Sequence, residues 1–151
     1  MKIRTDFVTN SSSSSFILGF NSKDEIHDVI TNSLPSYWSE SAIQEVIDDV
    51  VNGITSNDAA LDVYSHSIWP FDFVFNGKSY WDMTRSERNS VEYQNFVQNE
   101  KDEMRNELAK ELNEYDVISV VEYEDHTDFG CEMEHHIMPG LSCMIRSISH
   151  H

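Results

Sequence analysis

The sequence predicts a single α+β domain, 1–151, built on a mostly antiparallel sheet. Three observations favour this class. Amphipathic helical patterns are mixed with short β-branched and aromatic runs, no segment repeats, and strands and helices do not alternate as regular βαβ units. A length of 151 residues suits one domain, and 39% hydrophobic with 11% aromatic residues suffices for a buried core.

Two short helices are predicted in the first third of the chain. The first covers about 22–34, where Ser22 and Glu25 have the spacing of a capping box and apolar residues follow at helical intervals. The second covers about 40–52, starts near Ser39 or Ser41 and has one broad apolar face. Helices of this length are marginal alone, so both are expected to pack on another element.

The middle of the chain is predicted to form strands. Leu61–Ser65 is compatible with a strand, and aromatic residues alternate along Phe71–Phe75. Asn76-Gly77 then separates two aromatic runs, which is typical of a type I′ turn, so we expect a central hairpin at about 69–83. The aromatic residues of this region are interpreted as a core face of the sheet, with a ligand-stacking face as the alternative: Trp69, Phe71, Phe73, Phe75, Tyr80 and Trp81.

A long helix is predicted at about 84–114, opened by the capping box of Thr84 and Glu87. Its apolar stripe is too irregular for sustained heptads, so packing across a sheet is favoured over a coiled coil. Strands are expected at Val117–Tyr123 and Cys143–Ile148. The polar stretch between them, 124–142, is expected to hold a short helix around Cys131–Met138.

Residues 1–15 form a serine-rich N-terminal arm, for which a flexible linker and an ordered strand both stay open. Ile3, Phe7 and Val8 before the serines indicate short strands. From Phe7 to Phe16 the chain reads FVTNSSSSSF. This segment resembles an N-terminal motif of uncharacterised proteins from bacteria and their phages, which otherwise look dissimilar to one another. The resemblance implies a phage or mobile-element origin and no particular activity.

The charge of the chain is strongly negative. Twenty-seven acidic and ten basic side chains give a formal net charge of −17. This composition excludes the usual electrostatic grip on nucleic acid or an anionic membrane, which requires clustered Lys and Arg. Residues 24–77 hold ten acidic side chains and 111–134 hold nine, with no Lys or Arg in either block. The acidic excess is therefore concentrated in two segments.

The cysteine content and the N-terminus predict a cytoplasmic protein. Cys131 and Cys143 do not form the dense framework of a small secreted domain, although one disulfide between them stays open. No apolar segment follows Lys2 and Arg4 as a signal peptide requires, and no run is long enough to span a membrane.

The leading functional prediction is that a carboxylate-rich surface binds a basic protein. Its narrower form is a nucleic-acid mimic or inhibitor that occupies the phosphate-binding groove of its partner. An acidic surface that serves only solubility is the competing interpretation. No cofactor, direct nucleic-acid contact or membrane contact is expected, and the chain is expected to be a monomer or small homo-oligomer. The residues predicted to pair with the partner's Lys and Arg are Asp48, Asp49, Glu124, Asp125 and Asp128.

A small metal-dependent enzyme is the main alternative. If Cys131–His136 is helical, side chains four residues apart share one face and could hold zinc or another divalent ion. The candidate ligands are His126, Cys131, Glu132, His135 and His136. Their spacing matches no established metal motif, and no catalytic nucleophile or phosphate-binding glycine loop is apparent, so an enzyme is not the favoured prediction. His150 and His151 are set aside, because an affinity tag also leaves a terminal histidine pair. A third alternative is a structural or assembly component that acts through the long helix and the serine-rich arm.

Overall fold

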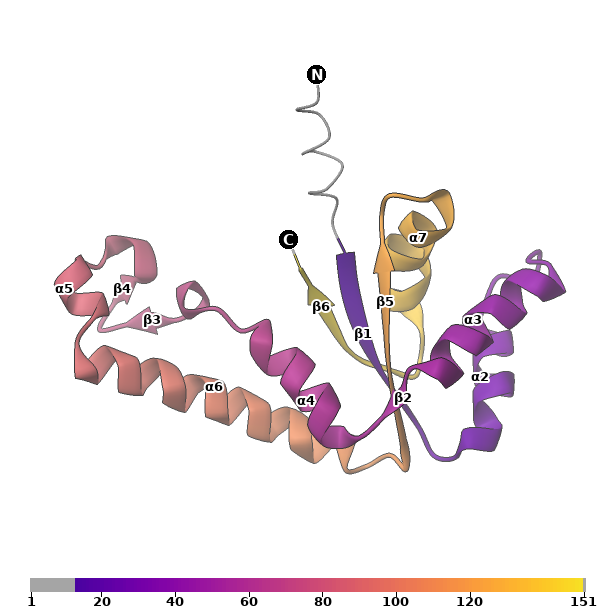
Figure 1. Ribbon diagram of the computed structural model, residues 1–151, viewed down its shortest axis with the longest axis horizontal. Helices are drawn as coiled ribbons and strands as arrows, with labels where there is room; N and C mark the ends of the chain where they lie inside the picture. The colour runs from indigo at the N-terminus through magenta and orange to yellow at the C-terminus, as the bar shows by residue number, and fades with distance from the viewer. Residues whose placement is uncertain (1–12, 151) are drawn as a thin grey trace, which may run out of the picture.

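The structure is a computed structural model that describes residues 13–150. Helices supply most of the elements and surround a small sheet (Figure 1). The elements in chain order are β1 (Ser13–Phe20), η1 (Lys23–Glu25), α2 (Ile26–Ser33), α3 (Glu40–Asn52), β2 (Ile54–Thr55), α4 (Asn57–His66), η2 (Pro70–Asp72), β3 (Val74–Phe75), β4 (Lys78–Ser79), η3 (Tyr80–Asp82), α5 (Arg85–Arg88), α6 (Val91–Leu112), β5 (Val117–Glu124), α7 (Asp128–Glu132), η4 (Met133–Ile137), η5 (Met138–Gly140) and β6 (Met144–Ser149).

The main sheet has four antiparallel strands in the order β2-β5-β1-β6. Strand β1 pairs with β5 from Ser13↔Glu124 to Phe20↔Val117, and with β6 on its other side. Its apolar residues from Phe16 to Phe20 do not alternate with polar ones, and all are buried. Such a continuous apolar run is what a strand covered on both faces requires.

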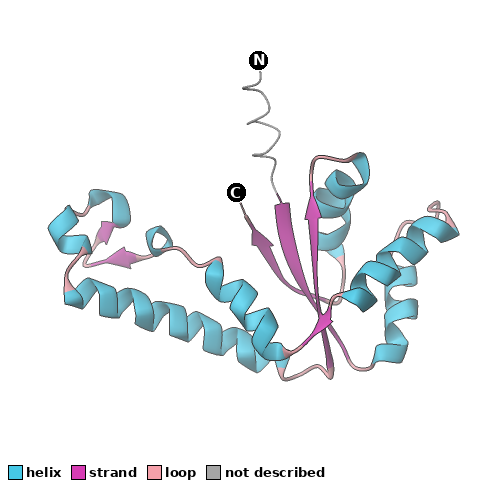
Figure 2. Cartoon of the chain, in the orientation of Figure 1, coloured by secondary structure: helices cyan, strands magenta, loops and turns pink. Residues whose placement is uncertain are grey.

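Helices cover both faces of this sheet (Figure 2). Phe16, Leu18 and Phe20 of β1 pack in one cluster with residues of α2, α3 and the α7–η5 segment. Ile17 points to the opposite face, where Ile118 and Ile148 pack against α4 and α6. Successive side chains of a strand point to opposite faces, so β1 alone contributes to both cores.

A third cluster lies away from the sheet, at the far end of α6 (Figure 1). Tyr93 and Val97 of α6 pack there with Met83 and with aromatic residues of the hairpin segment. We call residues 69–97 the hairpin lobe. Because β3 and β4 pair only with each other, the lobe is attached through α6 and the segment that follows α4, not through the main sheet.

The α+β class, the two short helices and the last two strands are confirmed. The hairpin turn is confirmed as well, since Asn76 and Gly77 have φ of 51° and 77°. The predicted hairpin is nevertheless a separate two-stranded sheet flanked by short 3₁₀ turns. The expected helix around Cys131–Met138 is present but starts at Asp128 and continues as a π-helix from Met133 to Ile137.

Two local predictions are wrong, and the long helix is confirmed with a break near its start. Leu61–Ser65 lies inside helix α4, whose N-terminus is capped by the Ser56 hydroxyl. The long helix is present as the 22-residue α6, and its predicted first turns form the separate short helix α5, because a second cap at Ser90 starts a new helix after the Thr84–Glu87 capping box. Ser22 makes no side-chain cap, and Glu25 accepts a hydrogen bond from the Asn21 N–H instead.

The serine-rich arm is ordered where the structure describes it. Ser13–Ser15 belong to β1, and the side chains of Ser14 and Ser15 are buried. The predictions for residues 1–12, including the short strands around Ile3 and Phe7, lie outside the described residues. Cys131 and Cys143 are both free thiols. Among residues 13–150, no helix is both long enough and apolar enough to cross a membrane.

Candidate functional site

β5 and the end of α3 border an open hollow of about 280 Å³ whose lining includes two acidic residues. Asp49 comes from α3 and Glu122 from β5. The backbone brings them together at Gly53, whose carbonyl accepts a hydrogen bond from the Val120 N–H at 2.9 Å. A Cβ on Gly53 would lie 2.3 Å from the Val120 carbonyl oxygen, so only glycine permits this approach.

Tyr123 fixes the position of Asp49. Its hydroxyl donates a hydrogen bond to Asp49 Oδ2 at 2.8 Å. Burial, this hydrogen bond and the negative charges of Asp49 and Glu45 all raise the pKa of Tyr123 above its usual range. Glu45 lies one helical turn before Asp49 and therefore shares its face of α3. We call Glu45, Asp49 and Glu122 the acidic strip.

The acidic strip includes only one residue of the predicted partner-binding set, Asp49. Asp48 is exposed next to it, where its carboxylate accepts a hydrogen bond from Gln44. Glu124 lies two residues beyond Glu122 and therefore on the same face of β5. Asp125 follows Glu124, and exposed Asp128 is in the first turn of α7, which packs on β5.

Sequence reasoning missed Glu45 and Glu122. The four-residue spacing from Glu45 to Asp49 and the two-residue spacing from Glu122 to Glu124 were signals that could have found them. The structure thus joins the first acidic block to the second across the α3–β5 contact.

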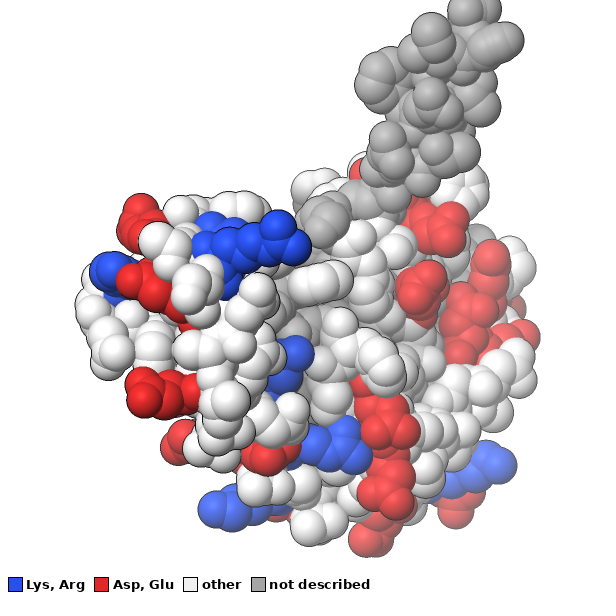
Figure 3. All heavy atoms as spheres, turned by 60° about the vertical axis from the view of Figure 1, so that its left-hand side comes forward, with Lys and Arg blue, Asp and Glu red and all other residues white. Residues whose placement is uncertain are grey.

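Lys and Arg do not neutralise this surface. Within residues 13–150, their ion pairs involve Glu87, Asp62 and Glu111. The acidic strip and its neighbours Asp48, Glu124 and Asp128 make no ion pair with Lys or Arg in the same range. Figure 3 shows Lys and Arg gathered over the hairpin lobe and along the base of the molecule, with mainly Asp and Glu on the right-hand side of the view.

A second group of acidic and histidine side chains lies at the end of β5. One ligand atom from each of Asp125, Glu134 and His135 lies within 4.8 Å of the others. Glu134 is buried, and its Oε1 accepts a hydrogen bond from the Ser14 hydroxyl at 2.8 Å. His135 Nε2 lies 3.6 Å from Glu134 Oε2. Two oxygens and one imidazole nitrogen form a donor set that suits a divalent transition metal.

Only His135 of the predicted ligands belongs to this group. His126 contacts Glu124 instead, with 2.8 Å between Nδ1 and Oε2. The prediction assumed α-helical spacing through Cys131–His136, whereas Met133–Ile137 is a π-helix. Its wider turn changes which side chains share a face, and Cys131, Glu132 and His136 lie outside the group.

Ser15, His150 and Glu122 form a third polar cluster. The Ser15 hydroxyl lies 2.8 Å from His150 Nε2 and donates to Glu122 Oε2 at 3.3 Å. This is not the arrangement of a nucleophile, its base and an orienting acid, because the carboxylate contacts Ser15 itself and lies 3.9 Å from the same ring nitrogen. Ser15 is also only 2% exposed. The cluster therefore ties β1 to β5 and to the end of β6.

No protein-family model, curated protein or solved structure matches this chain. Its function must therefore be inferred from its own residues.

Proposed function

We propose that the acidic strip binds a basic segment of a partner protein, with Asp48, Glu124, Asp125 and Asp128 at its margins. One observation carries this proposal: Asp49 and Glu122, from two acidic blocks far apart in sequence, line one open hollow. No Lys or Arg of residues 13–150 forms an ion pair with either of them. Lys and Arg of this range therefore leave both charges unneutralised, and the contacts that the two carboxylates do make are to the hydroxyls of Tyr123 and Ser15 and to the His150 ring.

Charge pairing explains how such a surface would work. Carboxylates accept short, charge-assisted hydrogen bonds from guanidinium and ammonium groups. A net charge of −17 also steers a basic partner toward the protein and raises the association rate at low salt. The Tyr123 hydrogen bond holds Asp49 in place before the partner arrives, which reduces the entropy lost on binding.

A defined basic peptide tests the proposal. The probe is a fluorescein-labelled twelve-residue peptide that alternates Arg and Gly, and binding is followed by fluorescence anisotropy. In the strip variant, E45Q/D49N/E122Q, three charges are removed while the side-chain shapes are kept. The control variant, E92Q/E103Q/E107Q, removes three charges from exposed positions of α6. Both variants therefore have the same net charge.

We expect the strip variant to bind the peptide at least tenfold more weakly than the control variant. The affinity of the unmodified protein should fall steeply between low and physiological salt, because the pairs are exposed and screened. Equal weakening in the two variants would mean that the peptide responds only to total charge, and the proposal would be rejected.

The narrower form of the proposal is nucleic-acid mimicry by a phage or mobile-element protein in the cytoplasm. In that case the partner's basic segment normally holds phosphates, so this protein and duplex DNA compete for it. The test is displacement of labelled duplex DNA from a basic DNA-binding domain. Displacement that the strip variant loses and the control variant keeps supports mimicry, and coexistence of DNA and this protein on the domain contradicts it.

The Asp125–Glu134–His135 group favours a second candidate function, metal binding, which is the first requirement of a metal-dependent enzyme. Three protein ligands leave further coordination positions for water or substrate. Calorimetric titration with Zn²⁺ or Mn²⁺ tests this candidate. H135A should abolish binding, whereas H136A, which removes the neighbouring exposed histidine outside the group, should retain it. Equal affinity in both variants would contradict the site.

A further inference from the structure

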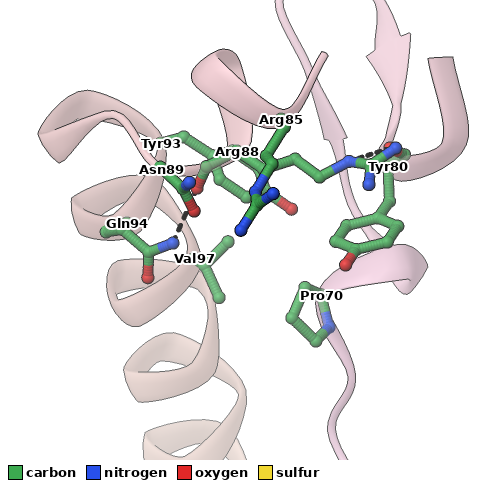
Figure 4. Close-up of a pocket in the computed structure, with 8 residues that line it drawn as sticks. All are labelled: Pro70, Tyr80, Arg85, Arg88, Asn89, Tyr93, Gln94 and Val97. Carbon is green, nitrogen blue, oxygen red and sulfur yellow. Dashed lines mark hydrogen bonds between the residues drawn. The ribbon is translucent and has the colours of Figure 1, made fainter. Parts of the chain in front are cut away.

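The hairpin lobe contains a pocket of about 430 Å³, between the 3₁₀ turns and the first turns of α6 (Figure 4). Its volume lies in the range of small-molecule sites. No acidic side chain is among its lining residues, although the protein carries a net charge of −17. Its lining includes Pro70, Tyr80, Arg85, Arg88 and Tyr93.

Two arginines give the pocket a positive charge. Arg88 is held in place, because its Nε donates to the Tyr80 carbonyl at 3.0 Å and its guanidinium lies 4.4 Å from the centre of the Tyr80 ring. Arg85 extends into the space between α6 and Tyr80 (Figure 4). Its guanidinium makes no hydrogen bond or ion pair with any residue of 13–150.

The nearby carboxylate does not neutralise Arg85. Glu87, on the same short helix, contacts Lys78 Nζ at 2.8 Å and accepts a hydrogen bond from the Thr84 N–H at 2.9 Å. Both contacts lower the pKa of Glu87, which keeps its charge engaged in the capping box. Arg85 therefore presents an unused, planar set of donors that matches a phosphate group.

Tyr93 adds a polar group without a partner. Its side chain is 3% exposed, and among residues 13–150 its hydroxyl has no hydrogen-bond partner. A buried hydroxyl left in this state costs free energy unless something satisfies it. Tyr93 is also in the first turn of the 22-residue helix α6, whose N-terminal end attracts anions. A hydrogen-bonding anion would satisfy both the hydroxyl and the helix N-terminus.

An exposed aromatic stack adjoins the pocket. Trp69 and Phe71 are stacked 5.6 Å apart, and Phe71 and Trp81 are stacked 5.8 Å apart. Trp81 is 71% exposed and Trp69 is 54% exposed, so both have ring surface open to a ligand. Pro70 lies between Trp69 and Phe71 in the chain, and Tyr80 immediately precedes Trp81, so the stack continues from the wall of the pocket.

We propose that this pocket binds a mononucleotide. Arg85 and the Tyr93 hydroxyl hold the phosphate near the N-terminus of α6, and the base stacks on the exposed face of Trp81. Stacking on aromatic rings tolerates any base, so the site is expected to distinguish nucleotides from other anions more strongly than one base from another. The site is remote from the acidic strip and independent of the function proposed for it.

Isothermal titration calorimetry with AMP tests this proposal, with inorganic phosphate and adenosine as the two partial ligands. We expect AMP to bind with 1:1 stoichiometry and at least about tenfold more tightly than either partial ligand, because only AMP engages both halves of the site. R85Q should weaken AMP binding at least tenfold. The control K110Q, which removes one exposed cation from the other end of α6, should leave binding unchanged.

Two further variants separate the halves of the site. W81A should reduce AMP affinity to that of inorganic phosphate, and its melting temperature shows whether the lobe survives loss of the contacts of Trp81 with Phe71 and Tyr80. Y93F should weaken AMP binding severalfold while the melting temperature stays equal or rises, since the unsatisfied hydroxyl is removed. A Y93F variant that melts earlier and binds AMP normally would indicate a structural role for the hydroxyl and overturn its assignment to the phosphate.

Three results would overturn the proposal as a whole: no saturable AMP binding, equal weakening by R85Q and K110Q, or inorganic phosphate binding as tightly as AMP. Binding of a short single-stranded oligonucleotide that depends on Arg85, without binding of AMP, would also overturn it and would identify the lobe as a single-strand platform. R85Q should still bind the basic peptide, because the acidic strip and the pocket of the hairpin lobe are separate sites. The two proposals can therefore be tested independently.

Discussion

The hydroxyl of Tyr123 donates a hydrogen bond to Asp49 Oδ2 at 2.8 Å. This bond joins the acidic pair Asp48 and Asp49 on α3 to β5, which belongs to the second acidic block, 111–134. The contact orients a carboxylate that also faces solvent. A buried ring therefore supports a half-buried charge, which links the packing of the α3–β5 contact to the proposed binding surface.

Replacing Tyr123 by phenylalanine removes the hydrogen bond to Asp49 without removing any carboxylate of the acidic strip. Y123F loses the hydrogen bond to a charged acceptor and should reduce the free energy of unfolding by about 1–3 kcal/mol. Urea unfolding measures this change. Y37F is the control, because Tyr37 is 81% exposed and its loss of a hydroxyl should change stability by no more than about 0.5 kcal/mol. Equal stability of Y123F and Y37F would contradict the structural importance of the contact.

The same variant has a distinct alkaline behaviour. The pKa of Tyr123 is raised in the folded protein, so the folded state binds its proton more tightly than the unfolded state does. Stability from this group is present below the unfolded pKa of about 10 and falls above it, by up to about 1.4 kcal/mol per pH unit. The decrease in stability above pH 10 should be shallower in Y123F.

The buried thiol of Cys143 is expected to reduce the stability of the protein at a lower pH than Tyr123 does. Burial raises the pKa of its thiol from 9.0 to about 11. The thiolate is therefore disfavoured in the folded state, and stability falls as pH rises from about 9 to about 11, by about 3 kcal/mol at most. C143A should lose this dependence between pH 9 and 10, whereas C131A should keep it. An identical pH profile for the two variants would argue against the buried thiol as its source.

Element types were predictable wherever the local signals agreed. The Asn76-Gly77 turn and the Thr84–Glu87 capping box depend on neighbouring residues alone, and both formed as expected. Leu61–Ser65 was predicted as a strand because a short apolar run does not distinguish a strand from a buried helix. The Ser56 cap and the burial of Ala60 and Leu61 favour the helix, and this burial requires packing against α6.

The candidate sites were less predictable, because tertiary contacts assemble them. The acidic strip exists only because Gly53 lets α3 approach β5, and nothing near Glu122 in sequence indicates Asp49 as its neighbour. The aromatic residues of the hairpin lobe fall into a packed group and an exposed group, also because of tertiary contacts. Phe73, Phe75 and Tyr80 pack against α6, whereas Trp69 and Trp81 remain exposed because the hairpin does not join the main sheet.

Gly53 offers a direct test of the α3–β5 approach. In G53A the added methyl group would lie 2.3 Å from the Val120 carbonyl oxygen and 2.8 Å from Ser119 Oγ, and backbone cannot yield cheaply. We expect a loss of about 1–3 kcal/mol in the free energy of unfolding, the range for overpacked sites. Basic-peptide binding should weaken as well, because Asp49 and Glu122 would move apart. Unfolding by urea and the anisotropy assay measure the two effects, and an unperturbed G53A would contradict the close contact.

Gly77 tests the turn without any steric contribution from neighbours. A Cβ at Gly77 would meet no atom within 4 Å, so the cost of G77A arises from its φ of +77° alone. We expect the free energy of unfolding to fall by about 1–2 kcal/mol, the cost of a left-handed backbone for a residue with a Cβ. G140A is the matched control, since Gly140 has equally open surroundings and no positive φ, and alanine there should be neutral or slightly stabilising. If the hairpin lobe unfolds separately from the main sheet, G77A will lower the midpoint of a first transition, detected by the fluorescence of Trp69 and Trp81. The midpoint of the transition of the remaining helices, detected by far-ultraviolet circular dichroism, will then stay unchanged. A single transition shifted equally in both signals would show that α6 couples the lobe to the sheet.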